Sequence, residues 1–415
     1  MKTAPRGLRL HVALLGRRNA GKSSLLNAIL RQNAAIVSEQ AGTTTDPVEK
    51  PMELLPLGPV LFIDTAGIDD EGALGAQRVE KTRQVLERCD VGVLVVAAGD
   101  WGPFERLLWE ELRARQVPTV VVFNKQDLGG PAPALLETLS QARVPVIHAV
   151  AHRGHGAPEL REALLRVAPA DFVEMPSLVS DLVPPGEVCV LVVPIDLEAP
   201  KGRLILPQVQ TIRDLLDHDS AALVVKEREL KSTLDLLRAP PALVVTDSQV
   251  FLKVAGDTPA AVPLTSFSIL FARFKGDLLA FTRGALAIDR LESGARVLIA
   301  EACSHHPIGE DIGRVKIPRW LTQYVGGKLD FVHIQGHDFP TDVSDFALVV
   351  HCGGCVHNRR EMLARSSRCR EQGTPITNYG MCIAHSLGIL GRALEPFPSA
   401  HDAYLSHRDT FPSSL

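Results

Sequence analysis

The chain has 415 residues, which exceeds the usual size of one domain and predicts two or three. Hydrophobic residues make up 46% and charged residues 22%, a composition typical of a globular protein and not of a disordered one. The formal net charge of −4 argues against a large nucleic-acid contact surface, because such surfaces need clustered Lys and Arg. No apolar run reaches the roughly 18 residues that cross a bilayer. We therefore expect no nucleic acid and no membrane among its partners.

The N-terminus carries basic residues before the apolar run Leu10–Leu15, but no small-residue cleavage site follows. We interpret the run as a first strand and expect a cytoplasmic protein.

The seven cysteines, an odd number, do not suit a disulfide framework in so long a chain. Cys89, Cys189 and Cys369 lie among apolar or helical residues and are interpreted as buried thiols. The interpretation of Cys382 stays open.

The first 170 residues alternate between β-branched runs and helical stretches. The expected strands are Leu10–Leu15, Val60–Ile63, Val91–Ala97, Thr119–Phe123 and Val144–Ala149. The expected helices are Lys22–Arg31, Gln77–Arg88, Phe104–Arg115, Ala134–Ala142 and Ala157–Val167. Buried strands separated by helices predict a parallel, doubly wound α/β sheet.

A Pro-rich linker, about 168–187, precedes a second α/β region. Its expected strands are Val188–Val193, Ala221–Val225 and Ala242–Val245, with helices at Leu206–Leu216 and Glu229–Leu237. It shows no catalytic constellation, so assembly or dimerisation is its default function.

A third region follows. Its expected strands are Arg296–Ala300, Phe331–Ile334 and Phe346–Val350, and its expected helices are Phe267–Arg273, Asp277–Glu292, Arg359–Gln372 and Cys382–Leu394. We predict three domains, 1–170, 171–264 and 265–415.

A phosphate-binding motif lies between the first strand and the first helix. The segment 16–23 reads G-R-R-N-A-G-K-S and satisfies G-x-x-x-x-G-K-[ST] at every required position. In such a loop, backbone N–H groups wrap a β-phosphate at a helix N-terminus. Lys22 is expected on the β- and γ-phosphates and the Ser23 hydroxyl on Mg²⁺. A glycine-rich turn without a ligand is the less favoured alternative.

Two further motifs follow strands in the order typical of GTPases. Asp64 opens D-T-A-G at a strand end, where its carboxylate can hold the metal through water. Asn124, Lys125 and Asp127 belong to N-K-Q-D after another strand, and Asp127 can accept both donors of a guanine edge. Adenine offers the wrong donor pattern. The three motifs together predict a P-loop GTPase that binds GTP or GDP with Mg²⁺.

These motifs resemble the translation-factor-related small GTPases over about residues 8–168. The segment 42–46, G-T-T-T-D, is similar to their switch I pattern, which implies Thr44 as an Mg²⁺ ligand. The P-loop resembles that of bacterial tRNA-modification and ribosome-assembly GTPases, which implies K⁺ held near Asn19. Ile68 follows D-T-A-G where Ras-like enzymes have a water-orienting glutamine, so we expect slow, K⁺-assisted hydrolysis. In the fifth motif, Val150 stands at the usual serine position.

The expected catalytic residues are Lys22, Ser23, Thr44, Asp64 and Gly67. The expected nucleotide-binding residues are Arg18, Asn19, Ala20, Gly21, Lys22, Ser23, Ser24, Asp64, Gly67, Asn124, Lys125, Asp127, Val150 and Ala151.

A second constellation lies in the third region. It reads C-S-H at 303–305, then 45 residues, then H-C-G-G-C at 351–355. A C-x-x-C pair presents two thiolates to one metal site, and Cys303 and Cys352 each lie near the end of an expected strand. Because strand ends in an open α/β sheet converge on a crevice, the third thiolate can reach the pair. Three cysteines and an imidazole suit zinc or an iron–sulfur cluster, and spacing alone does not choose between them.

Together with the GTPase motifs, this pattern resembles the HydF family of FeFe-hydrogenase maturation GTPases. The resemblance implies a 4Fe-4S cluster on Cys303, Cys352 and Cys355, with a labile or variable fourth ligand. His305 and His351 are candidates for that position or for donors behind the ligands. The resemblance also implies a dimerisation domain in the middle and a cluster-binding domain at the end, hence a homodimer. The histidines His306, His333, His337 and His357 are interpreted as solvated or structural.

The implied function is a GTP-hydrolysing scaffold that carries a di-iron precursor. It would deliver this precursor to the FeFe-hydrogenase apoprotein after interacting with two radical-SAM maturases. One alternative is a tRNA-modification or ribosome-assembly GTPase with a structural zinc, although no basic stretch follows residue 170. A radical enzyme would normally show C-x₃-C-x₂-C, which the sequence lacks. A scaffold with an inactive GTPase domain is disfavoured because Lys22, Ser23, Asp64 and Asp127 are present.

Overall fold

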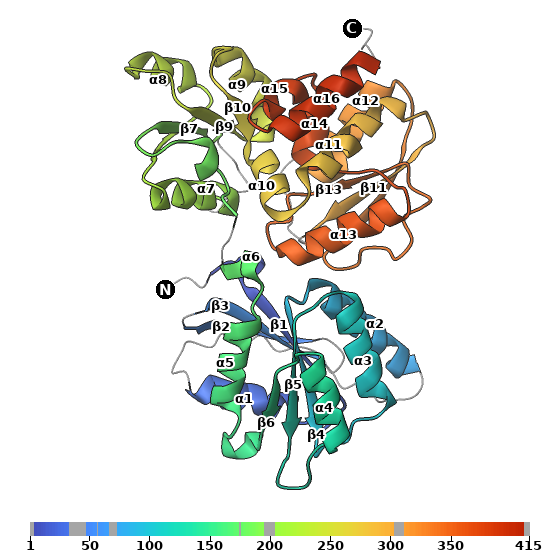
Figure 1. Ribbon diagram of the computed structural model, residues 1–415. Helices are drawn as coiled ribbons and strands as arrows, with labels where there is room; N and C mark the ends of the chain where they lie inside the picture. The colour runs from blue at the N-terminus through green and yellow to red at the C-terminus, as the bar shows by residue number, and fades with distance from the viewer. Residues whose placement is uncertain are drawn as a thin grey trace. The chain divides into compact units, whose positions relative to one another are not determined.

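The computed structural model describes residues 4–32, 47–55, 57–65, 73–173, 176–194, 204–302 and 311–410 (Figure 1). Thr44, Gly67, Ile68, Cys303, His305 and His306 lie outside these ranges. The chain divides into two compact units, 1–175 and 176–415. Among the described helices, none is both long and apolar enough to cross a membrane.

The first unit contains a six-stranded sheet in the order β2-β3-β1-β4-β5-β6. The strands are β1 (Leu10–Leu15), β2 (Val48–Leu54), β3 (Gly58–Asp64), β4 (Val91–Ala97), β5 (Thr119–Asn124) and β6 (Val146–His148). All neighbours pair in parallel except β2, which runs antiparallel to β3. Strand β2 was not predicted from the sequence. Its residues V-E-K-P-M-E-L include charges and Pro51, and a strand of that composition is tolerated at a sheet edge.

Helices cover both faces of this sheet. They are α1 (Lys22–Gln32), α2 (Ala73–Arg88), α3 (Pro103–Ala114), α4 (Pro133–Gln141) and α5 (Ala157–Val167), followed by the short α6 (Ala170–Val173). Every residue of β1 is buried: Val12 packs with α1 and α5, whereas Ala13 packs with α2, α3 and α4. A strand buried on both faces needs a nearly continuous apolar run, which is what the sequence has there. The predicted doubly wound fold is confirmed.

The second unit begins with a four-stranded parallel sheet in the order β10-β9-β7-β8. Its strands are β7 (Val188–Val192), β8 (Ala221–Val225), β9 (Leu243–Thr246) and β10 (Leu264–Ser266). Its helices are α7 (Leu206–Asp217), α8 (Leu230–Leu236) and α9 (Phe251–Asp257). The short β10 was not predicted, because three residues give no periodic signal.

A second four-stranded parallel sheet follows, in the order β12-β11-β13-β14. Its strands are β11 (Arg296–Glu301), β12 (Asp330–Gln335), β13 (Leu348–His351) and β14 (Ile376–Asn378). The accompanying helices are α10 (Phe267–Lys275), α11 (Leu278–Leu286), α12 (Ile317–Val325), α13 (Arg359–Glu371), α14 (Tyr379–Ser386), α15 (Leu390–Leu394) and α16 (Pro398–Thr410). One continuous apolar core joins the two sheets, since Val190 of β7 and Val349 of β13 belong to it.

The predicted single helix Cys382–Leu394 is wrong, because the chain forms α14 and α15 there. Gly388 interrupts it with a φ of +73°, a left-handed conformation that favours glycine. The amide of Ile389 donates to the carbonyl of Ala384 at 2.9 Å, which ends α14 in a Schellman motif. The expectation that two helices finish the chain is also wrong, since α16 follows α15.

Candidate functional site

The P-loop connects β1 to α1, and its lysine hydrogen-bonds to the backbone of the loop. Lys22 is buried, and its Nζ donates to the carbonyl oxygens of Gly16 and Arg17, each at 2.8 Å. Gly16 has a φ of +141°, and a Cβ there would lie 2.2 Å from the carbonyl oxygen of Val95. Only glycine fits such a position, so the loop can pass close to the end of β4.

The two side chains that were predicted to bind Mg²⁺, Ser23 and Asp64, lie side by side next to the P-loop. The hydroxyl of Ser23 donates to Oδ2 of Asp64 at 2.5 Å, and Asp64 ends β3, the neighbour of β1 in the sheet. Burial raises the pKa of Asp64, while the Ser23 hydrogen bond and the charges of Lys22 and Lys50 oppose that shift. A hydroxyl and a carboxylate beside the phosphate loop fit Mg²⁺, which prefers oxygen ligands.

The side chain of Asn124 links three segments: the end of β5, the P-loop and the fifth motif. Its Nδ2 donates to the carbonyl of Ala20 at 2.9 Å, and its Oδ1 accepts from the amide of Ala151 at 3.0 Å. The side chain is 2% exposed, so both bonds are shielded from water. Asp127, three residues later, is exposed and therefore accessible to a base. Asn124 thus holds the P-loop and the fifth motif in place, while Asp127 can contact the guanine edge.

An ion pair that sequence reasoning missed anchors the P-loop from outside. Arg17 makes two hydrogen-bonded contacts of 2.9 Å with the carboxylate of Glu105, which is 1% exposed. Glu105 also accepts from the amide of Gly102 at the start of α3. The two charged residues are 88 positions apart, and no local pattern relates them.

The C-x-x-C segment begins where β13 ends, beside β11. The amide of Cys352 donates to the carbonyl of Ala300 at 2.9 Å, and the amide of Ala302 donates to Sγ of Cys352 at 3.0 Å. Cys303 directly follows Ala302 in the sequence. The two predicted cysteine segments therefore leave adjacent parallel strands, and the Cys352 sulfur already accepts a backbone hydrogen bond. A half-buried Cys355 stands three residues on. Soft thiolate donors of this kind suit zinc or an iron–sulfur cluster.

Lys275, the last residue of α10, lies under the C-x-x-C loop. Its Nζ donates to the carbonyl oxygens of Gly354, Cys355 and His357 at 2.9, 3.1 and 2.8 Å. Burial lowers the pKa of Lys275 to about 8, against the opposing charges of Cys355, Cys352 and Glu361. Burial likewise raises the pKa of the Cys355 thiol, and Lys275 opposes that shift. A lone lysine at a helix end carries no sequence signal for this role.

His351 is fully buried, and both its ring nitrogens have protein partners. Nδ1 lies 2.7 Å from the carbonyl oxygen of Cys352, and Nε2 lies 2.8 Å from Nη1 of Arg365. Because arginine can only donate, Nε2 accepts and Nδ1 carries the proton. Burial and the Arg365 charge lower the pKa of His351 to about 3. The ring is therefore a neutral link between the cysteine loop and α13.

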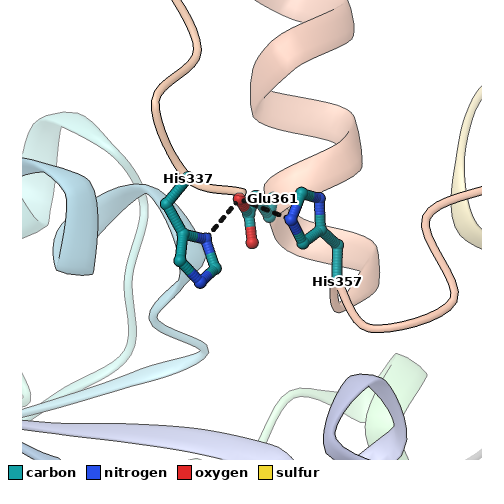
Figure 2. Close-up of side chains that lie close together, drawn as sticks. All are labelled: His337, His357 and Glu361. Atoms are coloured by element: carbon teal, nitrogen blue, oxygen red, sulfur yellow. Dashed lines mark hydrogen bonds and ion pairs between the residues drawn. The ribbon is translucent and has the colours of Figure 1, made fainter. Parts of the chain in front are cut away.

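The network continues from Arg365 to Glu361, one turn earlier on α13. Nη2 of Arg365 lies 2.8 Å from Oε1 of Glu361. Nδ1 of His337 lies 2.8 Å from the same oxygen (Figure 2). Burial alone would raise the pKa of Glu361, but the His337 hydrogen bond and the charges of His357 and Arg365 lower it well below its usual range. Desolvation lowers the pKa of His357, whose ring is 1% exposed. The burial of His357 excludes a solvated histidine there and leaves the structural alternative.

The other described cysteines are inert. Cys89, Cys189, Cys369 and Cys382 are all buried. Burial raises the pKa of Cys189, Cys369 and Cys382 to about 12 in each case, which keeps these thiols protonated. The interpretation of the first three as buried thiols is confirmed, and Cys382 joins them.

Each of the three regions matches a protein-family model. Residues 11–125 match the 50S ribosome-binding GTPase model, residues 178–276 the hydrogen maturase F dimerization domain, and residues 279–396 the hydrogen maturase F tetramerization domain. The middle region is therefore a dimerization domain, as predicted. The third region is a tetramerization domain, which adds a level of assembly to the predicted homodimer.

The N-terminal part of the chain resembles several GTPases of known name. The tRNA modification GTPase MnmE of Synechococcus sp. is 41% identical over 170 residues, covering 40% of this chain and 36% of that protein. GTPase Der of Campylobacter hominis is 39% identical over 126 residues, covering 28% of this chain and 26% of that protein. The chain thus spans about a third or less of the length of these curated relatives. A crystal structure of Aquifex aeolicus Era bound to GDP.AlF4- is 31% identical, with a TM-score of 0.33, over 38% of this chain and 56% of that one.

The GTPase prediction is confirmed for the N-terminal domain, with GTP or GDP and Mg²⁺ as its ligands. The two maturase models together cover more than half of the chain and account for most of its C-terminal unit. The chain belongs to the hydrogen maturase F family.

Proposed function

We propose that this protein is a cytoplasmic, GTP-hydrolysing carrier for FeFe-hydrogenase maturation. It holds a 4Fe-4S cluster on Cys303, Cys352 and Cys355, carries a di-iron precursor, and delivers it to the hydrogenase apoprotein. Two radical-SAM maturases act on the carrier before delivery. The nucleotide state controls which partner is bound and does not drive chemistry at the cluster.

The contact between Ala302 and Cys352 carries the cluster part of the proposal. A thiol that accepts a backbone N–H at 3.0 Å is held in a fixed direction, and such bonds stabilise a metal-bound thiolate. The next residue along the chain is Cys303, so both sulfur-bearing segments start from one edge of the sheet. Lys275 fixes the loop that carries the third cysteine, Cys355, through three carbonyl oxygens. A bound cluster would supply an anchoring point for the precursor.

The fourth cluster position is assigned to His305 or to a replaceable small ligand. The alternative candidate, His351, would first have to give up the hydrogen bond from Arg365. That bond is fully buried, and leaving the guanidinium without its acceptor is costly. His351 is better suited to hold the loop in place through the Cys352 carbonyl.

In the GTPase domain, Lys22 would turn from the carbonyls of its own loop towards the β- and γ-phosphates. Ser23 and Asp64 would hold Mg²⁺ directly and through water, with Thr44 completing the site. Bound Mg²⁺ would neutralise charge that develops between the β- and γ-phosphates. Asn19 has a left-handed φ of +59° and an exposed side chain, which leaves it accessible for K⁺ beside the phosphates.

The alternative of a tRNA-modification or ribosome-assembly GTPase applies only to the N-terminal part. The relatives named for those roles align with that part alone, and the two maturase domains occupy most of the remainder. We therefore do not favour it.

The test is anaerobic reconstitution of the full chain with iron and sulfide, followed by EPR spectroscopy and metal analysis. Cys352→Ala should lose the cluster signal while keeping its GTP turnover. Cys369→Ala, a buried thiol on α13, is the matched control and should keep both. Lys22→Ala should keep the cluster, lose GTP hydrolysis and fail to support hydrogenase maturation in cells. Zinc in place of iron, or maturation by a variant without Cys303, Cys352 and Cys355, would contradict the proposal.

A further inference from the structure

Three metal-ligating side chains gather beside the C-x-x-C loop without belonging to it. His337 follows β12, His357 precedes α13, and Glu361 lies in the first turn of α13 (Figure 2). One ligand atom from each lies within 4.8 Å of the other two. Neither the family resemblance nor the spacing of the cysteine motif assigns them a ligand role.

His357 and Glu361 have buried polar atoms without a hydrogen bond. His357 is 1% exposed, and within the described residues neither Nδ1 nor Nε2 makes a hydrogen bond, although Nε2 lies 3.5 Å from Oε1 of Glu361. Oε2 of Glu361 is also buried without a partner among those residues. Buried polar groups are almost always paired, so each such atom calls for an explanation. Here they belong to two members of the same cluster.

We propose that His337, His357 and Glu361 form a second metal site, which takes a divalent transition-metal ion such as Zn²⁺ or Fe²⁺. Two imidazoles and one carboxylate are a donor set that both ions use in proteins, with an open position for an exchangeable ligand. The site does not depend on an iron–sulfur cluster at the cysteines.

The distances allow a metal with little rearrangement. Metal–ligand bonds of about 2.0–2.1 Å in tetrahedral geometry put ligand atoms about 3.3 Å apart. Nε2 of His357 lies 3.5 Å from Oε1 of Glu361, close to that value. Nδ1 of His337 lies 2.8 Å from the same oxygen and would have to retreat by about half an ångström. Its side chain is 29% exposed and lies on a loop after Gly336, so it has room to move.

Arg365 acts as a positioning residue for this site. It donates to Oε1 of Glu361 at 2.8 Å, and that oxygen keeps a second lone pair for the ion, while Oε2 is also available. The same guanidinium contacts His351, whose other nitrogen meets the Cys352 carbonyl. The second metal is thus linked to the cysteine loop through Arg365 and His351.

The test isolates the site in a full-length variant that lacks the cluster ligands, Cys303→Ala/Cys352→Ala/Cys355→Ala. With Mg²⁺ and GDP occupying the GTPase domain, Co²⁺ is titrated and followed by visible absorption. We expect one tightly bound equivalent with nitrogen and oxygen ligation and no thiolate charge-transfer band. Adding His337→Ala or Glu361→Gln should weaken binding by more than about 100-fold. Adding His333→Ala, a half-buried histidine on β12 outside the triad, should leave it unchanged.

Equal Co²⁺ binding with and without His337→Ala would overturn the proposal, as would an equal loss from His333→Ala. If the triple variant fails to fold, the wild-type chain supplies the second measurement. Purified His337→Ala should then contain one equivalent less zinc or iron than wild type, with the cluster spectrum of the two proteins alike. Identical metal content would contradict the second site, whatever the fate of the cluster proposal.

Discussion

Lys275 donates a hydrogen bond to the carbonyl oxygen of Cys355 at 3.1 Å, from a position 80 residues earlier in the chain. The same ammonium holds the carbonyls of Gly354 and His357, and its side chain is 2% exposed. One buried cation therefore organises the backbone from Gly354 to His357, the second half of the C-x-x-C loop and the residues after it.

Replacing Lys275 by Met keeps the length of the side chain and removes all three donors. Buried carbonyls that lose their partner cost about 1–3 kcal/mol each, and partial access to water reduces the sum. We expect a loss of about 3 kcal/mol, seen by calorimetry as a fall of roughly 6 °C or more in the melting temperature of the C-terminal unit. Iron uptake on reconstitution should fall as well. Lys253→Met, at an exposed lysine of α9, should change neither quantity.

Nucleotide choice should depend on Asp127. Asp127→Asn replaces an acceptor of the guanine edge by an amide, which suits the carbonyl of xanthine instead. We expect GDP affinity to fall about 100-fold or more and xanthosine diphosphate affinity to rise, measured by calorimetric titration. Glu137→Gln removes an exposed carboxylate on α4 and should leave both affinities unchanged. Equal affinity of the wild-type chain for ATP and GTP would refute the guanine assignment.

GTP turnover should depend on the monovalent cation. K⁺ held by Asn19 would place a fixed positive charge near the bridging oxygen between the β- and γ-phosphates. We expect turnover in K⁺ to exceed that in Na⁺ by about tenfold, and Asn19→Ala to remove most of that difference. The measurement is phosphate release at constant ionic strength. Turnover that is indifferent to the cation would exclude this role for Asn19.

The stability of the GTPase domain should depend on pH through His11, which is 1% exposed in β1. Burial and the charge of Arg88 lower its pKa to about 4, against about 6.5 in an unfolded chain. Between these values the unfolded state binds the extra proton, so stability is lost as pH falls from about 6.5 to about 4. The full loss is about 3 kcal/mol.

The pH effect can be isolated by comparing His11→Gln with the wild-type chain. Urea unfolding of the GDP-bound full chain, followed by the fluorescence of Trp101 and Trp109 in a Trp320→Phe background, gives the free energy of unfolding. The difference in the free energy of unfolding between wild type and His11→Gln should change with pH over this window. The contributions of the carboxylates that both proteins share cancel in that difference. Thr138→Ala, at an exposed position of α4 without a titratable group, should show no such shift. A pH-independent difference for His11→Gln would contradict the assigned pKa.

The GTPase motifs and most of the elements that carry them could be predicted from the amino-acid sequence alone. The P-loop needs glycine, lysine and serine at fixed spacing between a strand and a helix, so a local pattern contains the whole requirement. The buried strands of the first sheet were equally readable, because a strand covered on both faces must be apolar along most of its length. The strand ends near Cys303 and Cys352 followed from the same reasoning.

Contacts between side chains far apart in the sequence became known only from the fold. Lys275 reaches Cys355, Arg17 reaches Glu105, and His337 reaches Glu361 across 80, 88 and 24 positions. None of these pairs has a periodic signature, because strand order and helix packing set the distance between them. Burial strengthens these contacts. The same lysine or histidine on the surface would be solvated and would contribute little to the stability of the fold. The sequence therefore predicted nucleotide and cysteine ligands, and the fold supplied the groups that hold the described ones in place.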